Sequence, residues 1–321
     1  MVTTKDNFAD SFSLWTPCHL PHIELTIWNE ICKKYSAVLN GKIDIFTARG
    51  CANRCAFCSV QKECNQKVLE RDDDSIIDEI NFLVNAGFIH FSIKDEDFFM
   101  RGSDRLLNII KQAHAMHPEI TFKIRTRIDE IMGNENIELK DLYEFGVREI
   151  QYGLETPDPN LLAKIKKGYR YENTEVIDFI KKTIQTGIVA NCSFILGIDG
   201  ESEQYYKSLI SFFGELESFK DKLKVYINFI TPHPYKNTFP LEDYQIITND
   251  LKYFTHKNPI AFPKKMKRIT RKEMIVTYNK IVAMFDPEHK YNPVISKEIR
   301  EKFLNGNNAA KSLPNYYEGK I

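Results

Sequence analysis

ITFKIRTRID, residues 120–129, alternates polar and apolar side chains with the two-residue period of a β-strand. The charged side chains at every second position over 123–129 share one face of that strand, and Ile124 and Ile128 lie on the other. Strands of a parallel sheet that helices cover on both faces are instead apolar almost throughout. We therefore expect this strand to pack its apolar face on helices and to turn its charged face toward a polar interior.

The same strand pattern recurs along the chain and alternates with helical patterns, which predicts repeated βα units and a parallel sheet. The expected strands span 43–50, 89–97, 120–129, 147–156, 189–198 and 225–232. The expected helices between and after them span 74–86, 103–117, 137–145, 159–165, 173–186 and 203–218. These six units are fewer than the eight of a closed TIM barrel.

Two architectures are compatible with strands that have one polar face. One is an antiparallel sheet with a solvated face, and the other is a partial (β/α)6 barrel whose lumen holds a polar cofactor and substrate. Because helices intervene between the strands, we predict an α/β fold with an N-terminal segment (1–42), a partial (β/α)6 barrel core (43–240) and a mainly helical C-terminal extension (241–321). In the extension, residues 269–285 are amphipathic at the helical period, and the basic run 263–272 fits either a solvated helix face or a contact with an anionic partner.

The bulk composition narrows the class of protein. A chain of 321 residues with 43% hydrophobic side chains can bury a sizeable core. Lys plus Arg and Asp plus Glu both number 44, so the zero net charge argues against a global basic field for nucleic acid. No signal-peptide pattern begins the chain, and no apolar run approaches the roughly 18–20 residues of a membrane span. Seven cysteines, an odd number, argue against a disulfide framework, so we expect a cytoplasmic protein without a membrane partner.

Three of the seven cysteines cluster in RGCANRCAFCSV, residues 49–60, directly after the first expected strand. Cys51, Cys55 and Cys58 have the spacing CxxxCxxC, which fits three kinds of structure. They could be small buried residues on one helical face, zinc ligands with Cys64 as the fourth, or the three thiolates of a 4Fe–4S cluster. Polar residues between the cysteines disfavour the helical face, and the lack of a distant second cysteine pair disfavours zinc.

With this motif the chain resembles the radical SAM superfamily, whose hallmark is CxxxCxxC in the loop after the first strand of a partial (β/α)6 barrel. Within it, the chain is most similar to the branch of cobalamin-type radical SAM enzymes, methylthiotransferases and the elongator catalytic subunit. Beside the cysteine loop, the likeness rests on IKDEDFF (93–99), GLET (153–156) with LLAKIKKGY (161–169), FILGIDGES (194–202) and TPHPYKNTF (231–239). The last of these departs from the family's TPxPGTP, with Tyr235 and Phe239 where glycine and proline are usual.

The resemblance implies an enzyme that binds a 4Fe–4S cluster and S-adenosylmethionine (SAM). An external electron donor of the flavodoxin or ferredoxin type would reduce the cluster, and cleavage of SAM would give a 5′-deoxyadenosyl radical that takes a hydrogen atom from the substrate. By the same likeness, the expected metal ligands are Cys51, Cys55 and Cys58. The expected cofactor-binding residues are Phe57, Asp95, Glu96, Arg125, Arg127, Glu155, Gly197 and Gly200.

Each cofactor-binding residue has an expected part. Phe57 would pack on the cluster or near the adenine. Asp95 and Glu96 stand where the family binds the SAM amino group, and strand parity favours Glu96. Glu155 either accepts hydrogen bonds from the ribose hydroxyls or pairs with Arg127.

The other four residues of this set are expected to bind the carboxylate and the adenine of SAM. A guanidinium suits the SAM carboxylate because it offers a bidentate fork, which makes Arg125 and Arg127 its candidates. Gly197 and Gly200 allow close approach of the backbone to the adenine, or simply form a strand-to-helix turn.

Side chains left over on the polar strand faces are candidates for the substrate pocket. These are Lys94, Lys123, Tyr226 and Asn228. Among the remaining cysteines, Cys192 is expected to be a buried core thiol, and Cys18 and Cys32 are isolated.

The expected reaction is hydrogen abstraction from a small polar substrate in specialised biosynthesis. Only 42 residues precede the expected barrel and DxHxxG is lacking, so the first alternative is a methyltransferase to which a partner protein delivers cobalamin. Since no RNA-binding module is recognised, a small molecule or a peptide is favoured over nucleic acid as substrate, with an RNA- or peptide-modifying radical SAM enzyme as a second alternative. The non-enzymatic alternative is a zinc-stapled binding module.

Overall fold

The computed structural model describes residues 25–60, 64, 66–100, 103–168, 171–231, 243–248 and 250–306. Cys18 and nearly all of the 231–239 motif lie outside these residues. Among the described residues, no helix has the length and apolar character that crossing a membrane requires.

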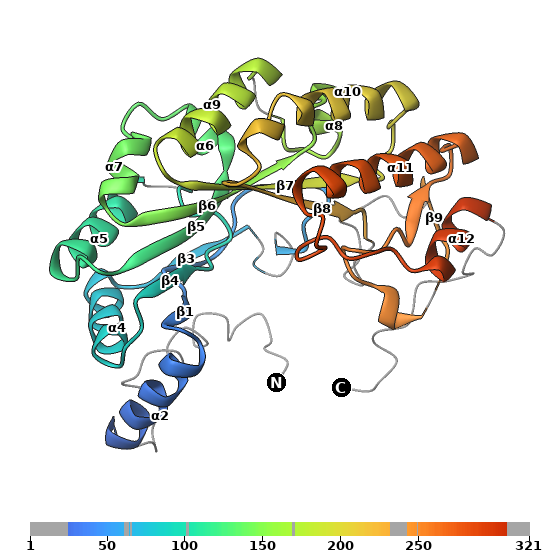
Figure 1. Cartoon of the computed structure of the whole chain (residues 1–321). Coiled ribbons are helices and arrows are strands. Elements are labelled where there is room, and N and C mark those ends of the chain that lie inside the picture. The colour runs from blue at the N-terminus through green and yellow to red at the C-terminus, as the bar shows by residue number, and fades with distance from the viewer. Residues whose placement is uncertain are drawn as a thin grey trace. The chain divides into compact units, whose positions relative to one another are not determined.

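A six-stranded sheet forms the centre of the fold, in the order β1-β4-β5-β6-β7-β8 (Figure 1). Its strands are β1 (Lys42–Ile45), β4 (His90–Ile93), β5 (Thr121–Arg127), β6 (Val147–Glu155), β7 (Val189–Leu196) and β8 (Leu223–Phe229). The pairs β1–β4, β4–β5 and β7–β8 are parallel. Sheet order follows chain order, as repeated βα units produce. The predicted α/β class with six βα strands is confirmed.

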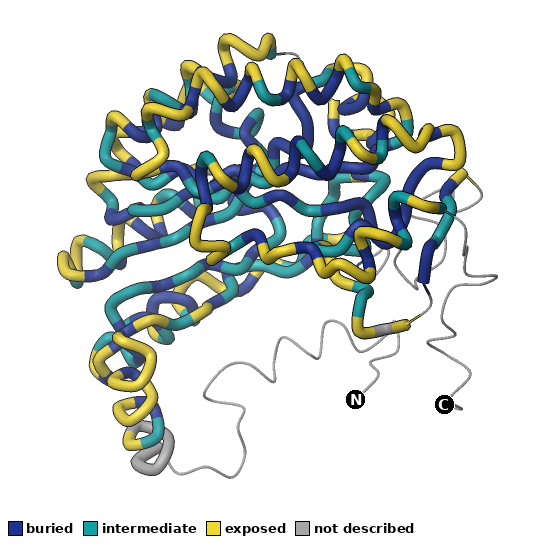
Figure 2. The backbone as a smooth tube through the Cα atoms, turned by 45° about the vertical axis from the view of Figure 1, so that its right-hand side comes forward, coloured by how far each residue is buried: buried dark blue, intermediate teal, exposed yellow. Residues whose placement is uncertain are grey.

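The helices are α2 (Leu25–Val38), α4 (Asp73–Asn85), α5 (Ser103–Met116), α6 (Ile128–Met132), α7 (Leu139–Glu144), α8 (Pro159–Lys164), α9 (Asn173–Gln185), α10 (Glu203–Gly214), α11 (Arg268–Phe285) and α12 (Lys297–Asn305), with short 3-10 helices η3 (Glu217–Phe219) and η5 (Leu251–Tyr253). The helices predicted between and after the strands are present as α4, α5, α7, α8, α9 and α10, and some other helices, such as α6, were not predicted. In Figure 2, buried positions follow the strands and one side of most helices, as amphipathic helices require.

The chain divides into two compact units. The first comprises Met1–Asn53, Glu63–Gln151 and Gln185–Val189, and the second comprises Arg54–Lys62, Tyr152–Ile184 and Ala190–Ile321.

Within the first unit, β5 confirms the alternation predicted from its sequence. Its even-numbered side chains are buried and its odd-numbered ones are half-buried. The buried face includes Phe122, whose ring lies 6.0 Å from that of Phe91 on β4, centroid to centroid. Helix α4 adds Ile76, Ile80 and Leu83 to the core of this unit. The polar face of β5 is therefore the face that the core does not use.

Within the second unit, aromatic side chains join the strands to the helices. Phe194 of β7 lies 4.7 Å from Phe213 of α10, and Phe213 lies 5.6 Å from Phe285 of α11, between ring centroids. Phe229 of β8 packs on Tyr278 of α11 at 5.1 Å. Such contacts bury large apolar areas and fix the strands against α10 and α11.

The first predicted strand, 43–50, is wrong in its second half. Residues beyond β1 leave the main sheet, and β2 (Ala48–Gly50) pairs antiparallel with β3 (Val68–Glu70). Asp95 accepts hydrogen bonds from the N–H (2.8 Å) and the hydroxyl of Thr47. The guanidinium of Arg71 donates to the carbonyl of Phe46 at 2.8 Å. These side chains supply hydrogen bonds in place of a neighbouring strand, so the chain turns out of the main sheet here.

The early ends of two other strands change where predicted site residues lie. The strand expected over 89–97 ends at Ile93, so Glu96 lies in the following loop. The strand expected over 120–129 ends at Arg127, and Asp129 belongs to α6. Strand parity therefore does not decide where the side chains of Glu96 and Asp129 point.

The C-terminal part combines helices with a small sheet. The predicted amphipathic helix over 269–285 is confirmed as α11. The sequence did not predict β9 (Tyr244–Ile246) and β10 (Ala261–Pro263), which pair antiparallel. Three-residue strands are too short to produce a recognisable alternation.

Candidate functional site

The three clustered cysteines lie in the loop after β2. Cys55 is buried, whereas Cys51 and Cys58 are half-buried. The N–H of Cys58 donates to the carbonyl of Cys55 at 3.1 Å, which closes a tight turn between them. Three thiols within eight positions of one loop are a donor set that suits an iron–sulfur cluster with one open iron. No three histidine, cysteine or carboxylate side chains converge on one metal position within the described part of the chain.

Glu96 lies against the start of the cysteine loop. Its Oε2 accepts a hydrogen bond from the N–H of Gly50 at 3.0 Å. Burial raises the pKa of the Glu96 carboxyl. A carboxylate that is hydrogen-bonded to Gly50, the residue before the motif, can bind an ammonium group there. Asp95 differs, because it is almost fully buried and holds Thr47 with both oxygens.

Asp97 is a residue of this loop that sequence reasoning missed. It is 6% exposed, and its Oδ1 accepts from the hydroxyl of Thr126 at 2.7 Å. Its Oδ2 accepts from the side-chain amide of Asn53, inside the cysteine motif, at 3.2 Å. Asp97 thereby ties the loop after β4 to β5 and to the cysteine loop. Its place in the acidic DED triplet is the signal that could have found it.

Both predicted arginines already have partners. The guanidinium of Arg125 donates to the carbonyls of Lys94 (3.0 Å) and Asp95 (3.1 Å), so it clamps the loop after β4. Arg127 forms a two-point ion pair with Asp129, at 3.0 and 2.8 Å. Either guanidinium would have to exchange part of these contacts to bind a SAM carboxylate.

The predicted substrate lysines of the first unit are also paired. Lys94 lies 3.4 Å from a carboxylate oxygen of Asp44, and Lys123 lies 2.5 Å from one of Glu149. Both side chains are about one-third exposed or more. Each of these lysines would have to give up its carboxylate partner to bind an anionic substrate.

In the second unit, Glu155 forms a buried ion pair with Lys167. The Nζ of Lys167 lies 2.7 Å from Oε1 of Glu155, and their side chains are 6% and 7% exposed. The ion pair considered from the sequence, with Arg127, is therefore wrong. The Oε2 of Glu155 forms no hydrogen bond to any described residue. One oxygen of a buried carboxylate is thus held by Lys167, and the other is available to a ligand.

The backbone around this pair is adapted to it. At the end of β6, the backbone of Glu155 has φ +67°, a conformation that residues other than glycine rarely adopt. A Cβ at Gly153 would lie 2.5 Å from the Nζ of Lys167 and 2.9 Å from Oε1 of Glu155, so any larger residue there would require the ends of these two side chains to shift. The Nζ of Lys167 also lies 5.8 Å from the ring centroid of Phe57, within cation–π range.

The loop after β7 is held by Glu201, a second residue that sequence reasoning missed. Its carboxylate accepts from the N–H of Gly197 (2.9 Å) and of Ile198 (3.0 Å), and the hydroxyl of Tyr206 donates to it at 2.5 Å. Gly197 has φ +93° and Gly200 has φ +106°, which explains both glycines as turn residues. Burial raises the pKa of Glu201 to about 7.

This raised pKa predicts a pH-dependent contribution to stability. A carboxyl whose folded pKa exceeds its unfolded value stabilises fully below the unfolded value, and the contribution is lost as pH rises through about 7. Between pH 4.5 and about pH 7.5, the free energy of unfolding of the wild type is expected to fall by about 3 kcal/mol more than that of Glu201→Gln. Urea unfolding across this range measures the difference, and parallel pH profiles for the two proteins would contradict it.

The remaining predicted residues lie on β7 and β8. Asn228 donates its side-chain amide to the hydroxyl of Ser193 at 3.1 Å, and the ring of Tyr226 lies 4.9 Å from that of Tyr291. Cys192 is 1% exposed, and burial raises its pKa, so the prediction of a core thiol is confirmed.

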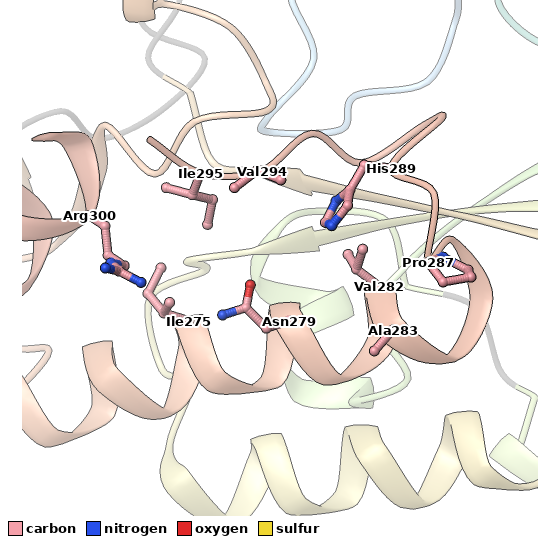
Figure 3. A pocket seen from close by; sticks show the side chains of 9 residues that line it. All are labelled: Ile275, Asn279, Val282, Ala283, Pro287, His289, Val294, Ile295 and Arg300. Carbon is pink, nitrogen blue, oxygen red and sulfur yellow. The ribbon is translucent and has the colours of Figure 1, made fainter. Parts of the chain in front are cut away.

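A groove of about 350 Å³ lies elsewhere in the second unit, between α11 and the segment that leads into α12 (Figure 3). Its walls are mostly apolar, and Asn279, His289 and Arg300 provide its polar side chains. None of the residues predicted to bind the cofactor lines this groove.

Residues 45–213, more than half of the chain, match the family model of the radical SAM superfamily. The chain belongs to this superfamily. Its members are enzymes that use a 4Fe–4S cluster and SAM and that need an electron donor. The 4Fe–4S site predicted at the cysteine loop is the cofactor site typical of this superfamily. A zinc site, as in the alternative of a zinc-stapled binding module, is not typical of it.

Similar proteins fall within the predicted branch. The chain is 23% identical to the uncharacterized methyltransferase PH0819 of Pyrococcus horikoshii over 265 residues, covering 80% of this chain and 53% of that protein. It is 23% identical to the anaerobic magnesium-protoporphyrin IX monomethyl ester cyclase of Rubrivivax gelatinosus, covering 81% of this chain and 45% of the cyclase. The chain thus spans about half the length of these relatives.

A solved structure shares the fold. The radical S-adenosylmethionine methyltransferase TsrM of Kitasatospora setae, solved with tryptophan substrate and a SAM analog, superposes with a TM-score of 0.59 at 16% identity. The superposition covers 80% of this chain and 54% of TsrM. At this identity the likeness concerns the fold alone.

Proposed function

We propose that this chain generates a 5′-deoxyadenosyl radical and uses it to abstract hydrogen from a small polar substrate in specialised biosynthesis. The observation that carries the proposal is the CxxxCxxC loop after β2, with Glu96 bonded to the residue that precedes it. When bound, a 4Fe–4S cluster and SAM supply the reducing electron and the radical. The protein's own task is to hold these groups and to shield the radical.

Each part of SAM has a candidate partner among the described residues. Cys51, Cys55 and Cys58 would hold the cluster. Glu96, a half-buried carboxylate that accepts a hydrogen bond from Gly50 at the start of that loop, suits the SAM amino group. The free Oε2 of Glu155 suits a ribose hydroxyl, because a buried acceptor without a donor gains a charge-assisted hydrogen bond there.

The adenine and the carboxylate have further candidates. The loop that Glu201 holds at Gly197 offers its backbone to the adenine edge. Lys167 is expected to lie near the ribose because it pairs with Glu155. Phe57 is expected there as well, because its ring lies within cation–π range of the Lys167 ammonium. Arg125 remains the candidate for the SAM carboxylate because only carbonyl groups bind it among the contacts described above.

Anaerobic reconstitution tests the proposal. We expect the protein to bind iron and sulfide in cluster stoichiometry and, with dithionite, to convert SAM to 5′-deoxyadenosine and methionine. A colourless protein with stoichiometric zinc and little iron would overturn it. In the cell we propose a flavodoxin- or ferredoxin-type electron donor and a cytoplasmic location, where thiols stay reduced.

A second candidate is a methyltransferase to which a partner protein delivers cobalamin. The relative named as a methyltransferase and the fold shared with TsrM support it. Formation of S-adenosylhomocysteine on addition of cobalamin, without equivalent 5′-deoxyadenosine, would favour this function. A peptide substrate is a third candidate, supported by 22% identity to the ribosomal protein uS12 methylthiotransferase RimO of Bdellovibrio bacteriovorus.

A further inference from the structure

Lys257 is a half-buried cation that reaches the edge of β8 from the segment after η5. Its Nζ donates to the carbonyl of Ile227 at 3.0 Å and lies 5.2 Å from the ring centroid of Tyr226. Burial lowers the pKa of Lys257 to about 8, so the ammonium form still predominates at neutral pH. One of its three N–H donors is used, and two remain.

Lys257 forms no ion pair with any carboxylate among the described residues. The acidic group that acts on it electrostatically is Asp286, whose oxygens are occupied elsewhere. Oδ2 of Asp286 accepts from the N–H groups of Tyr291 (2.9 Å) and Asn292 (2.7 Å), and Oδ1 accepts from the N–H of Lys290 (2.8 Å). A partly desolvated cation without an anion favours a negatively charged ligand.

The same Asp286 builds an aromatic platform beside the cation. By fixing the backbone of Tyr291, it places that ring 4.9 Å from Tyr226 with 36° between the ring planes. A second ammonium, that of Lys224, lies 6.0 Å from the Tyr291 ring. Both tyrosines are half-buried, and the exposed part of each ring can contact a flat apolar group.

We propose that Lys257, Tyr226 and Tyr291 form a subsite that binds a planar carboxylate, with the carboxylate on Lys257 and the apolar body on the two rings. This inference rests on the proposed function, of which it names the substrate class. Of the substrate-pocket candidates predicted from the sequence, the subsite includes Tyr226, whereas Lys94 and Lys123 are ion-paired.

The alternative to ligand binding is a purely structural role for Lys257. The ammonium covers one carbonyl at the edge of β8, as Asn292 covers its neighbour, the carbonyl of Val225, at 2.7 Å. In that case, replacing Lys257 would weaken folding without changing the preference between charged and neutral ligands. The two interpretations therefore predict different effects of replacing Lys257 on the preference for charged over neutral ligands.

Equilibrium dialysis of the anaerobically reconstituted holoprotein separates them. The probes are 4-fluorophenylacetate and its neutral analogue 2-(4-fluorophenyl)ethanol. The wild type is expected to bind the acid about tenfold more tightly, as one desolvated charge-assisted hydrogen bond provides. Lys257→Gln should bring the two affinities within about twofold of each other, and Lys257→Arg should preserve the preference. Tyr226→Leu should weaken both probes equally.

Arg300→Gln is the matched control, because Arg300 is the exposed cation beside the apolar groove of Figure 3. The Arg300→Gln variant should prefer 4-fluorophenylacetate over the neutral analogue as strongly as the wild type does. Failure to bind either probe, equal wild-type affinities, or a preference lost in Arg300→Gln and kept in Lys257→Gln would each overturn the subsite. SAM cleavage by the same wild-type sample is measured in parallel, so loss of the subsite and loss of the proposed function are distinguished.

Discussion

Cys55→Ala is expected to lower the iron content of the reconstituted protein to near zero and the rate of 5′-deoxyadenosine formation at least about 100-fold. Cys55 is the middle thiol of the motif and, at 8% exposed, is buried. With two thiolates left, the loop lacks the three protein ligands that such a cluster needs. Iron and sulfide analysis together with chromatography of the SAM products measure both effects.

Cys64→Ser is the control for this substitution. Cys64 is buried, and its Sγ accepts the N–H of Cys51 at 3.4 Å, so it lies close to the motif without belonging to it. A hydroxyl can accept the same hydrogen bond, and the variant should keep its iron and its activity. Iron retained in Cys55→Ala but lost in Cys64→Ser would show that the motif has been assigned to the wrong thiols.

Local patterns in the sequence were sufficient for the six strands of the main sheet and for the helices between them, because their periods reflect burial on one face. The break after β1 could not be predicted, since it depends on Asp95, 48 residues further along the chain, reaching back to Thr47. The 43–50 stretch itself contains no proline that would interrupt a strand. Tertiary hydrogen bonds decided where that strand ends.

In the candidate site, too, local sequence patterns predicted some residues, whereas tertiary contacts could not be predicted. Motif positions such as Glu96 and Glu155 were found because their residue types and spacing resemble a family pattern. The partners that orient them were missed, because a pairing such as Glu155 with Lys167 depends on how the chain returns after α8. Glu201 directly follows Gly200, and an acid at the end of a glycine turn could have indicated its bonds to backbone N–H groups.

Lys167→Met is expected to lower the free energy of unfolding by about 3–5 kcal/mol and to weaken SAM binding, because it leaves the charge of Glu155 buried without a partner. Urea unfolding and equilibrium dialysis of SAM measure the two effects. Lys164→Met is the control on the same segment. Lys164 pairs with Asp199, but its side chain is 48% exposed, so its loss should cost about 0–1 kcal/mol.

Stability and SAM binding can be separated with Lys167→Met/Glu155→Leu. Removing both charges together avoids an unpaired buried carboxylate, so this double variant should recover most of the lost stability. It should not recover SAM affinity, because the oxygen available to the ribose is gone with Glu155. If the double variant bound SAM as tightly as the wild type, the pair would serve folding alone. In that event Gly153 would leave room only for a structural ion pair, and the ribose would need another acceptor.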